Sequence, residues 1–396
     1  MEDNNIKSKE IIVKKKKKAI DIKALMNMDI KTIQSKLSSS LKKINKVKTP
    51  KKKRKVIAFD MGSSVIKIIQ GMYYKNILTV DKYISIKTPK DTIIDGEIKK
   101  SQELITLLDK TLKENGFNGK YGTCTNNSSL IINREISIPK VDDDEIDTVV
   151  RYEIQQYLPI NLEDYVLQVQ ILNEIQINET DRLNIRVIAY PNKIARGYYD
   201  MLLKLNLKPY TLDVNYNSVN KFINYTQRNN EDENNQKDTV AYIDMGATFI
   251  DVNIYKNGKL DFTRIIKAGG NDIDEMLAER VNKDLQSIEQ FKGNNVDLHE
   301  HFEPVNIYTR EIIDDWIEKI EKIIQFYKNK NQGNDVNKII IFGGSSKLNG
   351  LIDYMETKLG IEISKEKELS NLLFKSNDNG IPIEDFINVI GSLIRI

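Results

Sequence analysis

The feature that most constrains the fold is a pentapeptide that occurs twice, each time between two apolar segments. Asp60-Met-Gly-Ser-Ser follows the apolar residues of "VIAFD", and Asp244-Met-Gly-Ala-Thr follows those of "TVAYID". Apolar, β-branched segments on both sides of a glycine-containing turn predict a β-hairpin. Because the second copy comes roughly 180 residues after the first, the sequence predicts two similar domains, each opened by such a hairpin.

The two turns have the chemistry of a phosphate site. A glycine lets the backbone approach an anion closely, backbone N–H groups and hydroxyls donate to phosphate oxygens, and an aspartate can hold hydrated Mg²⁺. The candidates are Asp60, Gly62, Ser63, Ser64, Asp244, Gly246, Ala247 and Thr248, with Asp60 and Asp244 also as metal ligands. One such hairpin is weak evidence, since these residue types favour turns anyway. Two hairpins facing one another would clamp a polyphosphate from both sides.

A third element comes near the C-terminus. "KIIIFGGSSKLNGLIDYMETKLG" predicts a buried strand, a turn at Gly343-Gly344-Ser345 and a helix. A glycine pair at that place lets a flat base or a ribose lie against the backbone. The order of phosphate loop, phosphate loop and strand–GG–helix resembles the actin-like ATPase superfamily. This implies an α/β fold of two duplicated domains around a cleft for ATP and Mg²⁺.

The same resemblance assigns a role to the helix in "AGGNDIDEMLAERVNKDLQSIEQFKG", which in the superfamily offers an acidic and a basic residue to the adenosine. Here these residues are Glu289 and Lys292. The alternative is a solvated pair three residues apart on a helix surface.

Segments between the two hairpins resemble the PilM family of type IV pilus assembly proteins. The similarity is clearest at Asp95-Gly96-Glu97-Ile98, at Ile138-Pro139 and at the helix end from Tyr152-Glu153 to Tyr157-Leu158-Pro159, and it extends over about residues 56–396. It implies a cytoplasmic, nucleotide-binding scaffold. Such a scaffold captures the N-terminal tail of a PilN-like single-pass membrane protein and links it to the pilus motor.

Four regions are expected along the chain. Residues 1–54 form a basic tail, 55–215 the first domain with an α+β insert at about 88–208, 216–380 the second domain, and 381–396 a helix that returns to the first domain. A groove beside the first hairpin would accept the partner peptide in an extended conformation. Tyr152, Tyr157 and Leu158 are the candidate contacts, with ordinary core packing as the alternative for each.

Catalysis is harder to predict than binding. ATP hydrolysis needs a group that orients water on the γ-phosphate, and "YTLDVNYNSVNKFINY" occupies the passage from the first half of the chain to the second. Asp213 is the candidate and Asn215 the alternate. Asp213 could instead be an N-cap, and ATP could equally be a structural ligand that joins the two halves.

Charge separates the tail from the rest. Residues 1–55 carry a net charge of +14 and residues 56–396 one of −11, so the body has no nucleic-acid-binding character. "PKKKRKV" matches a nuclear-import signal, but such runs arise easily in a lysine-rich chain. From residue 22 to 44 the apolar residues follow a helical stripe, which would suit an anionic membrane surface, although disorder is an equal alternative.

Composition excludes several classes. The single cysteine, Cys124, rules out an internal disulfide or a thiolate zinc site. The sequence has no run of about eighteen apolar residues, so it predicts no membrane span. The expected location is cytoplasmic, at the inner face of the membrane. An FtsA-like division or filament protein and a sugar kinase are the alternative functions, and the oligomeric state stays open.

Overall fold

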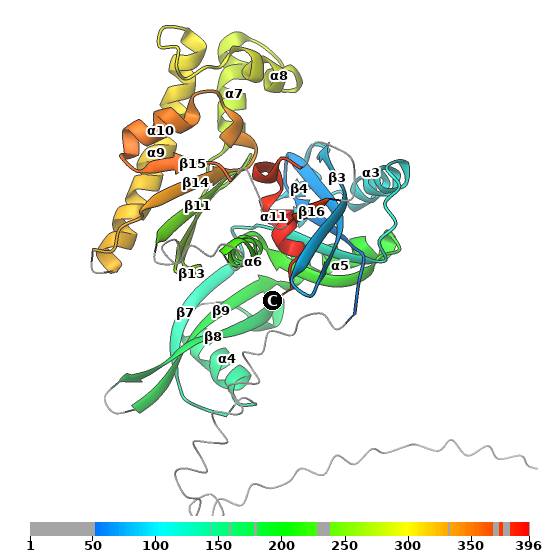
Figure 1. Ribbon diagram of the computed structural model, residues 1–396, viewed down its shortest axis with the longest axis vertical. Coiled ribbons are helices and arrows are strands. Elements are labelled where there is room, and N and C mark those ends of the chain that lie inside the picture. Colours follow the sequence, from blue (N-terminus) through cyan, green and yellow to red (C-terminus); the bar gives the residue numbers. More distant parts are fainter. Residues whose placement is uncertain are drawn as a thin grey trace, which may run out of the picture. The chain divides into compact units, whose positions relative to one another are not determined.

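The protein is seen here as a computed structural model that describes residues 52–142, 144–157, 160–177, 180–227, 238–331, 333–366, 372–374 and 381–395 (Figure 1). Leu158 and nearly all of the predicted basic tail, with its amphipathic stripe, lie outside these ranges. No helix within them is both long enough and apolar enough to cross a membrane.

The first predicted hairpin is present and organises a six-stranded sheet. Its strands are β1 (Val56–Met61), β2 (Val65–Tyr74), β3 (Ile77–Lys87), β6 (Tyr121–Asn126), β10 (Lys208–Val214) and β16 (Leu372–Phe374), in the order β10-β6-β1-β2-β3-β16. β1, β2 and β3 are antiparallel, whereas β6 pairs with β1 in parallel. All six side chains of β1 are buried, as its apolar sequence predicts.

The second hairpin builds a five-stranded sheet by the same plan. Its strands are β11 (Thr239–Met245), β12 (Ile250–Lys256), β13 (Lys259–Ile266), β14 (Lys338–Phe342) and β15 (Glu362–Ser364), in the order β13-β12-β11-β14-β15. β14 pairs with β11 in parallel, as β6 does with β1. Between β12 and β13, Asn257 and Gly258 both have positive φ, which is the backbone of a type I′ turn and suits an Asn-Gly dipeptide.

Two helices pack between the sheets. They are α6 (Asn215–Gln227) and α11 (Ile383–Leu393), and Figure 1 shows both in the middle of the molecule. One apolar core contains Phe59 of β1, Phe222 of α6, Ile387 of α11 and Phe342 of β14, so it joins both sheets through these helices. The outer face of the first sheet is covered by α3 (Ser101–Glu114) and α5 (Asn192–Lys204).

A second core lies on the other face of the five-stranded sheet, around the fully buried Trp316. Its helices are α7 (Gly270–Val281), α8 (Leu285–Asn295), α9 (Pro304–Lys330) and α10 (Leu351–Leu359). The second sheet therefore has helices on both faces, which explains why β11 and β14 are almost continuously apolar.

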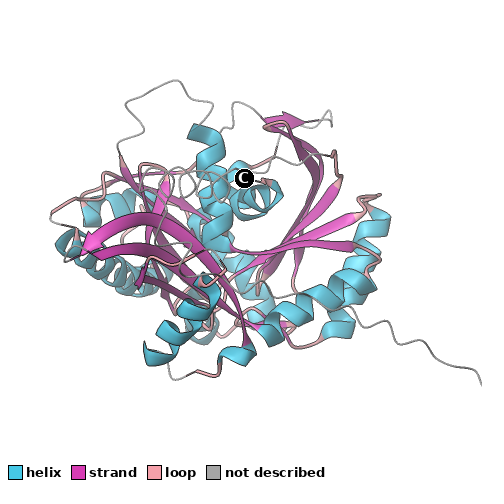
Figure 2. Cartoon of the chain, turned by 90° about the horizontal axis from the view of Figure 1, so that it is seen from below, coloured by secondary structure: helices cyan, strands magenta, loops and turns pink. Residues whose placement is uncertain are grey.

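A separate three-stranded sheet forms the insert. Its strands are β7 (Ile132–Pro139), β8 (Tyr165–Ile177) and β9 (Thr180–Pro191), in the order β7-β9-β8, and they pack against α4 (Ile146–Tyr157) through a small core of their own (Figure 2). The short elements are β4 (Ile93–Ile94), β5 (Glu97–Ile98), η1 (Leu162–Asp164) and η3 (Gly344–Lys347).

The insert with its own core is narrower than the predicted range 88–208. α3 and β6 precede it and belong to the first sheet's core, because β6 pairs with β1. The return to the first half also begins earlier than residue 381, since β16 pairs with β3. Sequence alone shows neither feature, because both depend on pairing between distant strands.

Candidate nucleotide site

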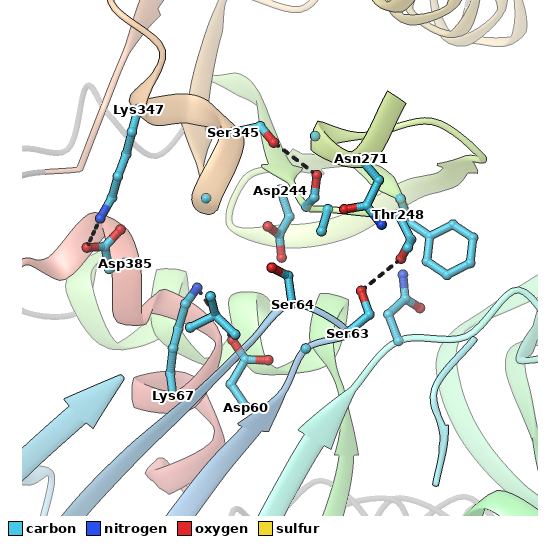
Figure 3. A pocket seen from close by; sticks show the side chains of 18 of the residues that line it. Asp60, Ser63, Ser64, Lys67, Asp244, Thr248, Asn271, Ser345, Lys347 and Asp385 are labelled. Atoms are coloured by element: carbon cyan, nitrogen blue, oxygen red, sulfur yellow. Dashed lines mark hydrogen bonds and ion pairs between the residues drawn. The ribbon is translucent and has the colours of Figure 1, made fainter. Parts of the chain in front are cut away.

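A cavity of about 540 Å³ opens where the two hairpins meet. Its walls are the turns after β1 and β11, the start of α7, α8 and the segment after β14 (Figure 3). Ser63 Oγ and Thr248 Oγ1 lie 3.2 Å apart, so the two predicted phosphate loops touch across the cavity. The duplicated pentapeptides, far apart in sequence, thus form one site.

The glycines of the two loops occupy equivalent positions. A Cβ atom on Gly62 would lie 2.5 Å from the carbonyl oxygen of Val65, and one on Gly246 would lie 2.7 Å from that of Phe249. The Gly246 N–H donates to this Phe249 oxygen at 3.0 Å. Glycine is therefore required by the turn itself as well as by any closely approaching anion.

Asp60 and Asp244 stand near the ends of β1 and β11 and line the cavity, but they face different partners. In the strand register, Asp60 lies opposite Lys67 and Asp244 lies opposite Asp251. The Lys67 ammonium is 3.8 Å from an Asp60 carboxylate oxygen. Asp251 accepts a hydrogen bond of 2.5 Å from the Asn127 amide.

The carboxylates carry unbalanced charge. Burial raises the pKa of Asp60 to about 6, and the charge of Asp244 adds to this effect while Lys67 opposes it. Burial also raises the pKa of Asp244, and burial together with the charge of Asp244 raises the pKa of Asp251 well above its usual range. A divalent cation would relieve this repulsion, and carboxylate oxygens are the ligands that Mg²⁺ prefers.

Asn388 of α11 reaches the same place and was not predicted. Its side-chain N–H donates to Asp244 at 2.7 Å, while its buried carbonyl oxygen Oδ1 has no hydrogen-bond partner among the described residues. A buried acceptor without a partner fits a bound cation or a ligand donor. The sequence signal was a polar residue within the apolar run "FINVIGSL".

The third predicted element contacts the second loop. Gly343 has φ +90°, and a Cβ atom there would lie 2.4 Å from Asp244 Oδ1. Gly344 and Ser345 line the cavity, and the Ser345 hydroxyl donates to the Gly246 carbonyl at 3.1 Å. The turn continues as the 3₁₀-helix η3, and α10 begins only at Leu351. Gly343 itself does not line the cavity but packs against Asp244, which does.

Glu289 and Lys292 of α8 both line the cavity, and each pairs with a residue of another element. Glu289 meets Lys87, from the end of β3, at 2.9 Å, and both side chains are exposed. Lys292 meets Asp274 of α7 at 2.5 Å. The alternative of a pair within α8 is therefore not what the structure shows.

Asp213, the candidate catalytic residue, has a different setting. It is buried, 2.5 Å from the Lys221 ammonium, and it accepts hydrogen bonds from the Val214 N–H and the Asn217 side chain. Although burial alone would raise its pKa, Lys221 and these hydrogen bonds hold that pKa below its usual value. Asp213 is not among the residues that line the cavity, whereas the alternate, Asn215, is.

Comparison with known proteins agrees with this geometry. The profile of a family described as type IV pilus assembly protein PilM matches residues 58–377. This chain belongs to the PilM family. A solved PilM–PilN type IV pilus biogenesis complex contains a chain with 20% identity and a TM-score of 0.74, covering 86% of this chain and 97% of that one. The predicted actin-like ATPase fold is confirmed.

Two further solved structures are more distant. EutJ, an ethanolamine utilization protein of Carboxydothermus hydrogenoformans, has 13% identity and a TM-score of 0.48, covering 91% of this chain and 98% of that one. MreB 5 of Spiroplasma citri, bound to AMPPNP, has 9% identity and a TM-score of 0.47, covering 86% and 95%.

Of the three partner residues predicted for this PilM-family protein, the two that lie within the described residues, Tyr152 and Tyr157, are on α4. Tyr152 is 67% exposed on α4, which packs on the three-stranded sheet. Tyr157 is the last residue of α4, and Leu158 lies outside the described residues. Figure 1 shows α4 beside β8 and β9, apart from β3.

A second cavity, of about 710 Å³, lies between α5 and β10. β10 is the edge strand of the first sheet, and Pro209 within it suits an edge. Ala195, Tyr199 and Tyr210 contribute to its lining, and the groove begins at Asn192, directly after the insert's strand β9. An extended segment could lie along such an edge.

Proposed function

We propose that this protein is an ATP-binding scaffold of type IV pilus assembly. It holds the cytoplasmic N-terminal peptide of a PilN-like inner-membrane protein and links that protein to the pilus motor from the cytoplasmic face of the membrane. The observation that carries the proposal is the meeting of the two Asp-Met-Gly loops at one cavity, within a chain of the PilM family.

ATP would lie with its phosphates between the loops. Hydroxyls and N–H groups around Ser63 and Thr248 would donate to the phosphates, and the base would lie near Gly344 and α8. Mg²⁺ would be held at Asp60 and Asp244, where it supplies the positive charge that the buried carboxylates lack. Asn388 would hold the Asp244 carboxylate through its side-chain N–H and would offer its unpartnered Oδ1 to the ion, beside Asp251.

Hydrolysis, where it occurs, would depend on Asn215 rather than on Asp213. The Asn215 side chain lines the cavity and is held by the Thr125 hydroxyl at 2.9 Å, so its amide could orient a water. Asp213 is engaged by Lys221 and is unsuited to accept a proton. We therefore propose slow turnover, with bound ATP acting mainly to join the two halves.

The partner peptide would bind in the groove between α5 and β10. Main-chain hydrogen bonds along an edge strand give affinity, and apolar side chains seated near Tyr199 and Tyr210 give selectivity. The exposed Tyr152 of α4 is the competing location. The basic tail would add attraction to an anionic leaflet.

The test is a calorimetric titration of the PilN-like partner's N-terminal peptide into the full chain. We expect micromolar binding that Tyr199→Glu weakens at least about tenfold and that Phe302→Glu, a change at a 92% exposed aromatic outside the groove, leaves unchanged. Loss of peptide binding in Tyr152→Glu alone would show that the peptide binds at α4. No binding to the wild type, together with ATP-dependent polymerisation, would favour the FtsA-like alternative.

A further inference from the structure

The insert touches the second half of the molecule through one buried arginine. Arg186, in the middle strand β9, is only 6% exposed. Its guanidinium pairs with Glu135 on the neighbouring strand β7 and also donates to the Leu260 carbonyl of β13 at 2.9 Å. One side chain therefore joins the three-stranded sheet to the sheet that carries the second phosphate loop.

The β12–β13 hairpin connects this contact to the nucleotide site. At one end, Asp251 of β12 lines the cavity and β13 leads to α7, whose Gly270 and Asn271 N–H groups donate to the second phosphate loop. At the other end lie the turn and Leu260. The seven residues of β12 span roughly 20 Å. The paired hairpin is therefore a continuous structural connection between Leu260 and the cavity.

The far end of the hairpin is also held by α6. Asn220 accepts from the Leu260 N–H at 3.3 Å, and Asn224 donates to the Gly258 carbonyl at 3.0 Å. The Arg186 contact thus ends on a rigid part of the second half. Any change in the angle between the two halves must either move the insert or break the contact between Arg186 and Leu260.

A like-charge pair opposes this contact. Arg264 of β13 lies close enough to Arg134 of β7 that burial and then the positive charge of Arg134 lower the pKa of its guanidinium. Attraction through Arg186 and repulsion between Arg134 and Arg264 act across the same boundary. The repulsion offsets part of the attraction, so this boundary is held less tightly than the Arg186 contact alone would hold it.

We propose that Arg186 is a positioning residue that couples nucleotide binding in the cavity to peptide binding at the insert. This inference rests on the proposed function. Both candidate peptide locations are connected to the insert. Tyr152 lies on it, and Asn192 of the α5–β10 groove directly follows β9 and donates to the Glu163 carbonyl of the insert at 2.6 Å. Coupling is reciprocal, so the peptide would change ATP affinity by the same factor.

The test compares peptide affinity without nucleotide and at saturating Mg–ATP, by calorimetry on the full chain. In the wild type we expect the two dissociation constants to differ at least about fivefold. In Arg186→Met the ratio should fall to within about twofold of one, while each ligand alone still binds. Arg186→Lys keeps a charge for Glu135, but its shorter reach does not place a donor where Arg186 Nη2 contacts both Glu135 and the Leu260 carbonyl, so it should also lower the ratio.

Arg182→Met is the matched control. Arg182 lies on the same strand and donates to the side chain and carbonyl of Ser137, within the insert. It should keep the wild-type ratio. A ratio near one in a wild type that binds both ligands would overturn the coupling and leave the proposed function intact. An unchanged ratio in both folded Arg186 variants would do the same. Failure of the wild type to bind either ligand would overturn both proposals.

Discussion

At the scale of single residues, the two halves of the cleft differ in what faces each loop aspartate. Lys67 lies opposite Asp60, and Asp251 lies opposite Asp244, each seven positions after its partner. In the first half the loop aspartate thus faces a lysine ammonium, while in the second half it faces another carboxyl group. This asymmetry supports the proposal that the site takes one added divalent cation, even though the loops themselves are nearly identical.

Asp60 gives a prediction about pH. Its folded pKa of about 6 lies above its ordinary 3.8, so the stability gained from the protonated form is present at low pH and is lost as pH rises through about 6. Without nucleotide or Mg²⁺, the difference in unfolding free energy between Asp60→Asn and the wild type should shift in favour of the variant as pH rises. From pH 5 to pH 7.5 this shift should be on the order of 1–2 kcal/mol. Urea unfolding at both values measures this shift, and an equal difference at both values would contradict it.

The buried pair of Asp213 and Lys221 gives another. Lys221 also donates to the Ile394 carbonyl, so the pair ties β10, α6 and the end of α11 together. Lys221→Met leaves a buried carboxylate without its cation and should destabilise the protein by about 3–5 kcal/mol. The double variant with Asp213→Asn should recover part of that loss in chemical unfolding. If both proteins were as stable as the wild type, the pair would have no structural role.

At this scale the sequence was informative about the loops and less so about their surroundings. Repeated pentapeptides revealed Asp60 and Asp244, but Lys67 and Asp251 become visible only once the strand pairing is known. Asp213 had the right position in the chain, yet the direction of its side chain depends on Lys221, one helix turn or more away. Residue type and order do not determine that direction.

At the scale of elements, α11 shows how closely the helices between the sheets pack. A Cβ atom on Gly391 would lie 1.9 Å from the Ser218 carbonyl oxygen of α6. Gly391→Ala should therefore destabilise the protein by about 1–3 kcal/mol or more, because α11 must move away from α6.

Gly197→Ala is the control for this change. On α5 the nearest atom to a new Cβ, on Ile98, is 4.0 Å away, so alanine should be neutral or stabilise by up to about 1 kcal/mol. Thermal or urea unfolding of the two variants provides the comparison. Equal effects of the two substitutions would show that helix propensity, and not the contact between α6 and α11, decides the result.

Most elements could be predicted from local pattern. The helices over 101–114 and 192–204 follow from apolar spacing and from the residues at their ends, and the hairpin at Asn257-Gly258 follows from turn chemistry. The insert's limits could not, because β6 joins the first sheet through β1, and β16 through β3. Long-range pairing leaves little trace in a short segment.

At the scale of the whole molecule, charge divides the tail from the body. Arg54 stacks on Tyr121 and Tyr210, so a deletion that spares the body should end before residue 52. Removing residues 1–51 should leave ATP affinity unchanged and weaken sedimentation with anionic vesicles, together with its dependence on salt. Equal sedimentation of both proteins would leave the tail without a role at membranes.

ATP binding between the two halves is the central property proposed for this protein. Isothermal titration calorimetry of the purified full chain should show one ATP per chain, with binding that requires Mg²⁺. Asp60→Ala removes a proposed metal ligand, and the valine of Gly246→Val would clash with the Phe249 carbonyl in the second loop. Gly344→Val is the cleanest variant, because a Cβ atom there meets nothing within 4 Å and would extend into the cavity without disturbing the fold.

We predict that all three variants weaken ATP binding at least about tenfold and that Gly197→Ala, outside the cavity, keeps wild-type affinity. Absence of binding by folded wild-type protein, or unchanged affinity in Asp60→Ala and Gly344→Val, would contradict the proposal that the paired loops hold a nucleotide.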